Sequence, residues 1–136
     1  MITIYNLKTH ELLEQHFESL TPLLFGSPHA SPFKGIAIAD IKTRLLDLCE
    51  NDGLILKASY GQAAAGVLIA EVQNGNELGV LELWIDPDAE ARMIDLLFEQ
   101  CRREVLRRDF RAIYCKHAWF ESIENQAIRA KFLSTK

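Results

Sequence analysis

This sequence has few cysteines, more acidic than basic residues and no long apolar run. Its 136 residues contain three cysteines, an odd number without a C-x-x-C pair, which argues against a disulfide framework or a zinc knuckle. The formal net charge of −4 argues against a nucleic-acid or anionic-membrane partner, because both attract a positive field. No apolar run approaches the length of a membrane span, and the first residues lack the pattern of a signal peptide. We therefore expect a cytoplasmic protein that contacts neither nucleic acid nor membrane.

The few potential metal ligands are also poorly placed. Cys115 and His117 lie two residues apart in an expected strand, so they share a face and offer two ligands. Zinc requires a third and a fourth ligand, and no second pair with a recognisable spacing occurs. We predict no metal site.

The length and composition predict one globular domain over residues 1–136. The chain is long enough for one hydrophobic core, and its hydrophobic content of 49% and charged content of 25% are typical of folded domains. The expected strands are residues 1–6, 54–60, 63–72, 77–85 and 111–117. Helices are expected between Thr9 and Pro22, from Asp40 to the Asn51-Asp52-Gly53 stop, after Asp88, and over residues 122–133.

Turn signals and helical periodicity give the topology. Asn74-Gly75 is a strong hairpin signal between two expected strands, and Asp86-Pro87-Asp88 ends the second of them. The helix that follows carries an apolar stripe, and a further strand follows the helix. The stripe consists of Ile94, Leu97, Phe98, Cys101 and Val105. We predict an α/β (α+β) fold with a mixed sheet: an antiparallel meander, then a β-α-β crossover, with helices on both faces.

The segment LWIDPDAEARMIDLLFEQC, with ENQAIRAKF after it, resembles the GNAT N-acetyltransferase superfamily. The first segment is similar to the fourth strand and third helix of that family, and the pattern extends from Ile2 to Leu133. The resemblance implies a GNAT-like sheet and acetyl-CoA as cofactor, with its pantetheine arm between the fourth and fifth strands. The residues that would bind the cofactor are Trp84, Ile85, Ala91, Arg92, Met93 and Ile94.

The loop after the fourth strand departs from the family pattern. In such enzymes a G-x-G/A loop presents backbone N–H groups to the pyrophosphate at a helix N-terminus. Here no glycine occurs after Gly79. The carboxylates expected around the loop are Asp86, Asp88, Glu90 and Asp95, opposed by Arg92 alone. Neighbouring like charges repel by about 1 kcal/mol in water, whereas a helix N-terminus returns roughly 0.3–1 kcal/mol.

The candidate catalytic residues also depart from the family pattern. Family members often use a carboxylate on the fourth strand as general base and a tyrosine in the late helix as general acid. Glu82 is on the corresponding strand. The tyrosine position falls at Lys131 or Phe132, so Tyr114 on the following strand is the substitute candidate.

These departures lead to a functional prediction with two alternatives. We expect a divergent GNAT domain with lost or altered acetyl-CoA use that acts as a binding or assembly module. The first alternative is an active acetyl-CoA-dependent N-acetyltransferase acting on a small amine or peptide. The second is a structural subunit of a larger complex.

The resemblance also suggests a partner. The family continues into two more strands after the late helix, and this sequence ends at Lys136. We therefore expect the strand at residues 112–117 to form an open sheet edge, which a second copy or another chain would cover.

Overall fold

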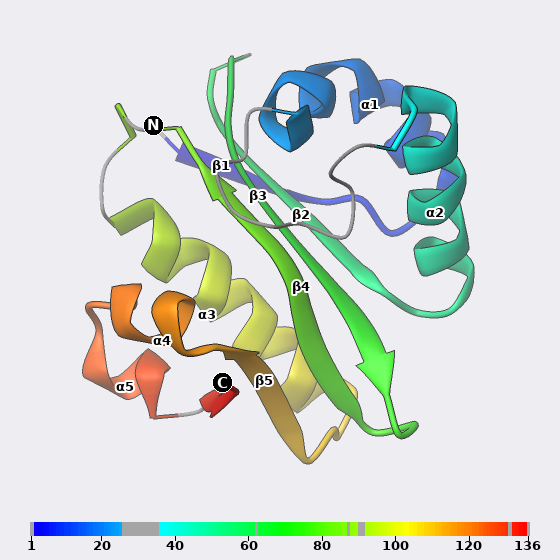
Figure 1. Ribbon diagram of the computed structural model, residues 1–136. Helices are drawn as coiled ribbons and strands as arrows, with labels where there is room; N and C mark the ends of the chain where they lie inside the picture. Colours follow the sequence, from blue (N-terminus) through cyan, green and yellow to red (C-terminus); the bar gives the residue numbers. More distant parts are fainter. Residues whose placement is uncertain are drawn as a thin grey trace.

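The fold is a six-stranded mixed sheet between two layers of helices (Figure 1). The computed structural model describes residues 2–25, 36–61, 63–86, 88–89, 92–130 and 132–135. The strands are β1 (Ile2–Asn6), β2 (Leu54–Tyr60), β3 (Ala63–Gln73), β4 (Glu77–Ile85), β5 (Ala112–Lys116) and β6 (Phe132–Thr135). The helices are α1 (His10–Phe25), α2 (Ile38–Glu50), α3 (Arg92–Arg107), α4 (His117–Ser122) and α5 (Gln126–Arg129).

The strand order β1-β2-β3-β4-β5-β6 confirms the predicted meander and crossover. The first four strands pair antiparallel, and β5 pairs parallel with β4 after the α3 crossover. The hairpin between β3 and β4 turns at Asn74 and Gly75, whose φ angles of 53° and 81° are left-handed, as the Asn-Gly signal predicts.

The two faces of the sheet have separate cores. On one face α1 and α2 pack through Leu13, Leu20 and Leu45 against sheet residues such as Val67 and Ile69. On the other face α3 packs through a second buried set, and α4 and α5 lie on the same side (Figure 1). The buried residues of α3 are Met93, Leu97, Phe98, Cys101 and Val105, so Met93 takes the core position predicted for Ile94.

A β-bulge in β4 sets which side chains face which core. Ile69 of β3 is opposite Glu82, but the next residue, Ala70, is opposite Val80, so Leu81 is an extra residue in β4. Residues directly opposite share a face, and Ile69 belongs to the core under α1 and α2. Glu82 therefore faces α1 and α2.

The C-terminal part of the chain differs from the prediction. The helix predicted over residues 122–133 is wrong, because the chain forms α4, α5 and then β6. Asn125 starts α5 anew: its side-chain oxygen accepts hydrogen bonds from the N–H groups of Ala127 and Ile128. The strand predicted to reach His117 ends at Lys116, and α1 extends to Phe25, past its predicted end.

The predicted open edge at residues 112–117 is also wrong. Strand β6 pairs parallel with β5, from Ile113 opposite Phe132 to Lys116 opposite Thr135. The edge of β5 that was predicted to be open is thus occupied by β6, and the reason for placing a partner chain there no longer holds. No helix in the described part of the chain is long and apolar enough to cross a membrane.

Candidate functional site

The candidate site forms where β4 and β5 separate. The two strands pair only over Glu77–Gly79 of β4 and Ala112–Tyr114 of β5. Strand β4 then continues to Ile85, whereas β5 ends at Lys116 and the chain turns into α4. The end of β4 is therefore left without a neighbouring strand on that side, and a cleft opens next to it.

This β4–α4 cleft has a volume of about 350 Å³ and a largely apolar lining. It is lined by Leu83, Trp84, Ile85, Ile94, Ala118, Trp119 and Ser122. Trp84 and Trp119 are the two tryptophans of the chain. Trp119 is buried, and the ammonium of Lys116 lies 5.0 Å from the centre of its ring. Apolar clefts with a few polar groups are the usual form of small-molecule sites.

Three of the predicted cofactor residues line the cleft, namely Trp84, Ile85 and Ile94. Met93 does not, because its side chain is fully buried and packs toward Gly66 of β3. Arg92 is exposed at the start of α3, and Ala91 lies outside the residues that the structure describes. The sequence did not predict helix α4, because residues 117–120 gave no helical signal.

Asp86 accepts two backbone hydrogen bonds in the turn before α3. The side chain of Asp86 accepts a hydrogen bond from the N–H of Asp88 at 2.9 Å, and its carbonyl accepts one from the N–H of Ala89 at 2.9 Å. Two donors that would hold an anion are thus occupied by Asp86, which also adds a negative charge. These two hydrogen bonds fix the position of the Asp86 carboxylate in the described part of the turn.

A second carboxylate of the expected phosphate site has a structural role. Asp95, in the first turn of α3, accepts hydrogen bonds from the N–H groups of Glu124 and Asn125 at 2.9 and 3.1 Å. These bonds tie α3 to the segment between α4 and α5, which supports the α4 wall of the cleft. The sequence indicated the charge of Asp95 but not this contact, since the partners lie 29 and 30 residues away.

The two predicted catalytic residues are not brought together. Glu82 is 1% exposed and faces α1 and α2, although the next residue, Leu83, lines the cleft. Tyr114 donates its hydroxyl hydrogen bond to Glu77 at 3.1 Å, at the start of β4. Glu77 and Glu82 are five positions apart on an extended strand, which corresponds to about 16 Å. The late-helix tyrosine position of the family corresponds here to a strand, since Phe132 begins β6.

Glu77 organises a buried polar network that sequence reasoning missed. Its carboxylate is 2% exposed and accepts hydrogen bonds from Asn74 at 2.7 Å, Arg111 at 2.9 Å and Tyr114. The Asn74 and Arg111 hydrogen bonds hold the pKa of Glu77 below its usual value. The network joins the β3–β4 hairpin to β5, and so holds the paired ends of β4 and β5 together below the cleft.

A second buried polar group lies beneath α1. Lys57 of β2 is 5% exposed, and its ammonium lies 3.0 Å from Nδ1 of His16 and 5.5 Å from the ring centre of Tyr5. Burial lowers the pKa of Lys57. Burial and the Lys57 charge lower the pKa of His16, which favours a neutral imidazole that accepts from the ammonium. Neither residue lines the β4–α4 cleft, so we assign the pair a structural role.

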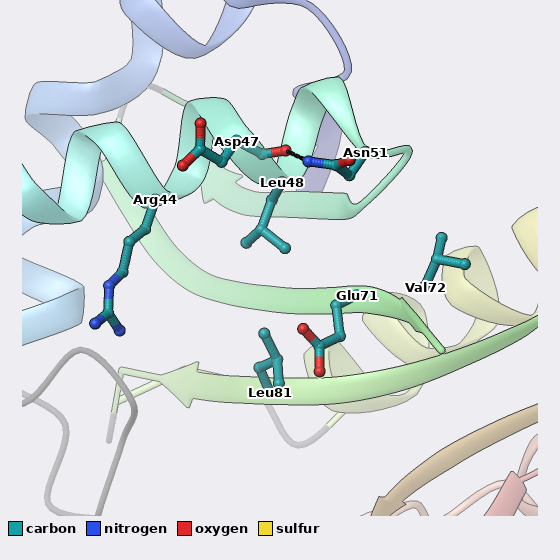
Figure 2. Close-up of a pocket in the computed structure, with 7 residues that line it drawn as sticks. All are labelled: Arg44, Asp47, Leu48, Asn51, Glu71, Val72 and Leu81. Atoms are coloured by element: carbon teal, nitrogen blue, oxygen red, sulfur yellow. Dashed lines mark hydrogen bonds between the residues drawn. The ribbon is translucent and has the colours of Figure 1, made fainter. Parts of the chain in front are cut away.

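A second hollow, of about 440 Å³, lies on the opposite face of the sheet between α2, β3 and β4 (Figure 2). One wall is a single face of α2, with Arg44, Asp47, Leu48 and Asn51 at positions i, i+3, i+4 and i+7. The other wall consists of Glu71, Val72 and Leu81. None of the predicted site residues lines this hollow.

Two of the three cysteines, Cys101 and Cys115, offer no reactive thiol. Cys101 and Cys115 are buried, and burial raises the pKa of each thiol to about 12. Cys115 and His117 do not share a strand face, because His117 begins α4, where it is exposed and lies 3.4 Å from Glu121. Within the described ranges, no group of three potential ligands could hold a metal ion.

Comparisons with known proteins connect this architecture to acetyltransferases. No family model and no curated protein sequence matches the chain. An acetyltransferase of the GNAT family from Staphylococcus aureus Mu50 is similar in structure, with a TM-score of 0.68, 13% identity, and coverage of 90% of this chain and 77% of that chain. A possible acetyltransferase from Clostridium difficile 630 has a TM-score of 0.64 and 12% identity, covering 96% of this chain and 85% of that chain. The PaiA N-acetyltransferase from Thermoplasma acidophilum, solved in complex with coenzyme A, has a TM-score of 0.57 and 16% identity, covering 81% of this chain and 75% of that chain.

Proposed function

We propose that this chain, which has the fold of the GNAT N-acetyltransferases, is a ligand-binding module that has lost standard acetyl-CoA chemistry. The observation that carries the proposal is the turn before α3. Asp86 occupies the N–H groups of Asp88 and Ala89 and brings a carboxylate to the place where a diphosphate would lie. The ligand of the module would occupy the β4–α4 cleft.

The magnitudes favour exclusion of a diphosphate. Two unit charges about 4 Å apart repel by about 1 kcal/mol in water and about 4 kcal/mol at an effective dielectric constant of about 20. A helix N-terminus returns roughly 0.3–1 kcal/mol. Asp86 and Asp95 keep their carboxylates at this end of α3 through hydrogen bonds to backbone N–H groups, which do not cancel their charge. Repulsion therefore exceeds the attraction of the helix end.

The positions of the candidate catalytic groups support the same proposal. A general base must lie within hydrogen-bond reach of its substrate, and Glu82 is 1% exposed on the side of α1 and α2. The hydroxyl of Tyr114 donates its hydrogen bond to Glu77. Neither group is presented to a molecule in the cleft.

An active N-acetyltransferase acting on a small amine or peptide is the second candidate. It is supported by the cleft itself, because Trp84, Ile85 and Ile94 line a gap beside the unpaired end of β4. This reading requires Asp86 to release the N–H groups of Asp88 and Ala89 so that they can bind the cofactor. It also requires a catalytic base other than a buried Glu82.

Calorimetry with acetyl-CoA separates the two candidates. The module predicts no heat of binding at millimolar acetyl-CoA, whereas a Kd below about 100 μM would favour the enzyme. The variant Asp88→Lys, which places a cation in the turn, should strengthen binding if repulsion is the obstacle. Asp47→Lys is the matched control, because it makes the same charge change in the hollow on the opposite face. Tight binding of acetyl-CoA by the wild-type chain would refute the proposal.

A further inference from the structure

We propose that the outer edge of β1 is an interaction surface, on which a second copy of this chain adds its own β1 as an antiparallel strand. Strand β1 forms one edge of the sheet and pairs with β2 on its inner side. The edge predicted at residues 112–117 is covered by β6, whereas no described strand pairs with the outer side of β1. This surface is separate from the β4–α4 cleft, so the inference does not depend on the proposed function.

The backbone of β1 presents hydrogen-bonding groups on this edge. The N–H of Leu7 donates to the carbonyl of Ile55 at 2.9 Å, in continuation of the β1–β2 register. Backbone groups of successive residues in an antiparallel strand point to alternate sides, so those of Ile2, Ile4 and Asn6 point outward. Over the described ranges, no other segment forms a backbone hydrogen bond with these three residues. The outer edge of β1 can therefore accept another strand.

The strand lacks the features that usually protect an edge. Its sequence, ITIYN, contains neither a charged residue nor a proline, and its register with β2 runs without a bulge from Ile2 to Asn6. Tyr5 is a large side chain that remains 36% exposed. The opposite edge strand, β6, has four residues, whereas β1 has five. Strand β1 is thus the longer edge that is open to pairing.

The strand is complementary to itself, which favours a second copy as the occupant. When two copies run antiparallel with a two-fold axis at Ile4, each Ile4 lies opposite the other, and Ile2 lies opposite Asn6 of the second copy. These are the residues whose backbone groups point outward, so each opposite pair can exchange both of its hydrogen bonds. Because the strand carries no charge, two chains of net charge −4 meet there without like charges directly opposite each other.

The side chains fit the same register. Ile2 and Ile4 pack against the core under α3, so the two Ile4 side chains would lie next to each other and extend that core across the axis. On the other face, Tyr5 of one copy would lie opposite Thr3 of the second copy. Pairs of an aromatic and a β-branched residue stabilise neighbouring strands. The Tyr5 ring is already positioned by His16, whose ring centre is 4.7 Å away.

The mass of the chain in solution tests the proposal. Between about 1 μM and about 1 mM, sedimentation equilibrium should show a shift from the 15.5 kDa chain to twice that mass. Ile4→Pro removes the outward N–H at the axis, a change that an edge strand tolerates, and should keep the chain monomeric. Ile4→Val has as many side-chain carbons as proline but keeps the N–H, so this matched control should dimerise. A monomeric wild-type chain, or a dimer that survives Ile4→Pro, would overturn the proposal.

Disulfide trapping tests the register, and it decides the question even if Ile4→Pro loses its fold. Opposite residues that exchange hydrogen bonds have Cα atoms about 5.5 Å apart, so Ile4→Cys should give a cross-linked dimer under mild oxidation. Ile2→Cys is the matched control, because the two copies of residue 2 would lie about 13 Å apart along the strands, beyond the reach of a disulfide. Cross-linking is measured relative to the wild-type chain, which has its own half-buried Cys49. Equal cross-linking of the two variants, or none with Ile4→Cys, would overturn the pairing about Ile4.

Discussion

Adding a side chain at Gly66 should disturb both the stability of the fold and the geometry of the cleft. Gly66 is buried in the middle of β3, and a Cβ there would lie 3.0 Å from Cδ1 of Ile85, 3.0 Å from Sδ of Met93 and 3.4 Å from Cδ1 of Leu97. Carbon atoms prefer separations of about 3.5–4.0 Å, so each neighbour would have to move by up to about 1 Å. The glycine thus allows the first turn of α3 to approach the sheet closely.

The expected magnitude is a balance of two effects. Overpacking a core lowers the free energy of unfolding by about 1–3 kcal/mol. Replacing a strand glycine with alanine raises it by about 0.5–1 kcal/mol, because the unfolded chain has less conformational entropy to lose. The nearest atoms are the ends of flexible side chains, so Gly66→Ala should lose a net of about 0.5–2 kcal/mol. Gly66→Val adds two more carbons and should lose about 3 kcal/mol.

Thermal and urea unfolding measure these losses, with about 3–5 °C in Tm expected for each kcal/mol. Ala63→Val, at the exposed start of β3, is the matched control and should change Tm little. Because Met93 is one of the crowded neighbours, Met93→Ala should make room for the new methyl group. Met93→Ala and Gly66→Ala together should therefore cost less than the sum of the two changes, by at least about 0.5 kcal/mol.

The result that would refute this reasoning is additivity. If the double variant loses the sum of the two single losses, the methyl group at position 66 does not meet Met93, and α3 approaches the sheet differently. Gly66→Ala should also shift the tryptophan emission, since Ile85 and Trp84 line the same cleft. If Gly66→Ala lowers the stability but leaves the emission spectrum unchanged, the packing of α3 against Gly66 does not affect the geometry of the cleft.

Three further changes test other parts of the structure. The pKa of His16 lies below its ordinary value of 6.5, so the unfolded chain binds a proton that the folded chain does not, and stability should fall as the pH drops from about 7 to about 5.5. His16→Gln, which keeps an acceptor for Lys57, should flatten that slope in urea unfolding. Asn125→Ala removes the cap of α5 and should cost about 1 kcal/mol in urea unfolding, whereas an unchanged midpoint would contradict the capping role. Ellman's reagent at pH 8 should label at most one thiol of the native chain, Cys49, and all three after unfolding. Rapid labelling of two or more native thiols would contradict the burial of Cys101 and Cys115.

The meander and the crossover could be predicted from the sequence because their signals are local. The predicted strands at residues 54–60 and 77–85 coincide with β2 and β4, since turn residues bound them. Asn74, Gly75 and Gly61 adopt left-handed φ angles that their residue types tolerate. The stripe on α3 follows from helical periodicity, apart from the exchange of Met93 for Ile94 at its start.

The C-terminal segment could not be predicted in the same way. Its apolar spacing fits a helix, whereas two interactions with distant parts of the chain favour the observed structure. Asp95 holds the N–H groups of Glu124 and Asn125, and β5 pairs with Phe132 and the residues after it. Strand pairing over such a separation depends on where β5 lies, which no local pattern specifies.

The candidate site, like the fold, could be predicted from the sequence only in part. Trp84, Ile85 and Ile94 could be identified from the sequence, because a strand end followed by a helix start brings neighbours in sequence to one place. The sequence by itself also determined the acidic character of the turn before α3. Only the tertiary structure decided that Glu82 is buried and that the Tyr114 hydroxyl donates a hydrogen bond to Glu77. The same is true of the position of α4, whose Trp119 lines the cleft. Residue type and spacing determine which conformations a segment prefers, whereas burial and hydrogen-bond partners depend on segments that meet only in the folded chain.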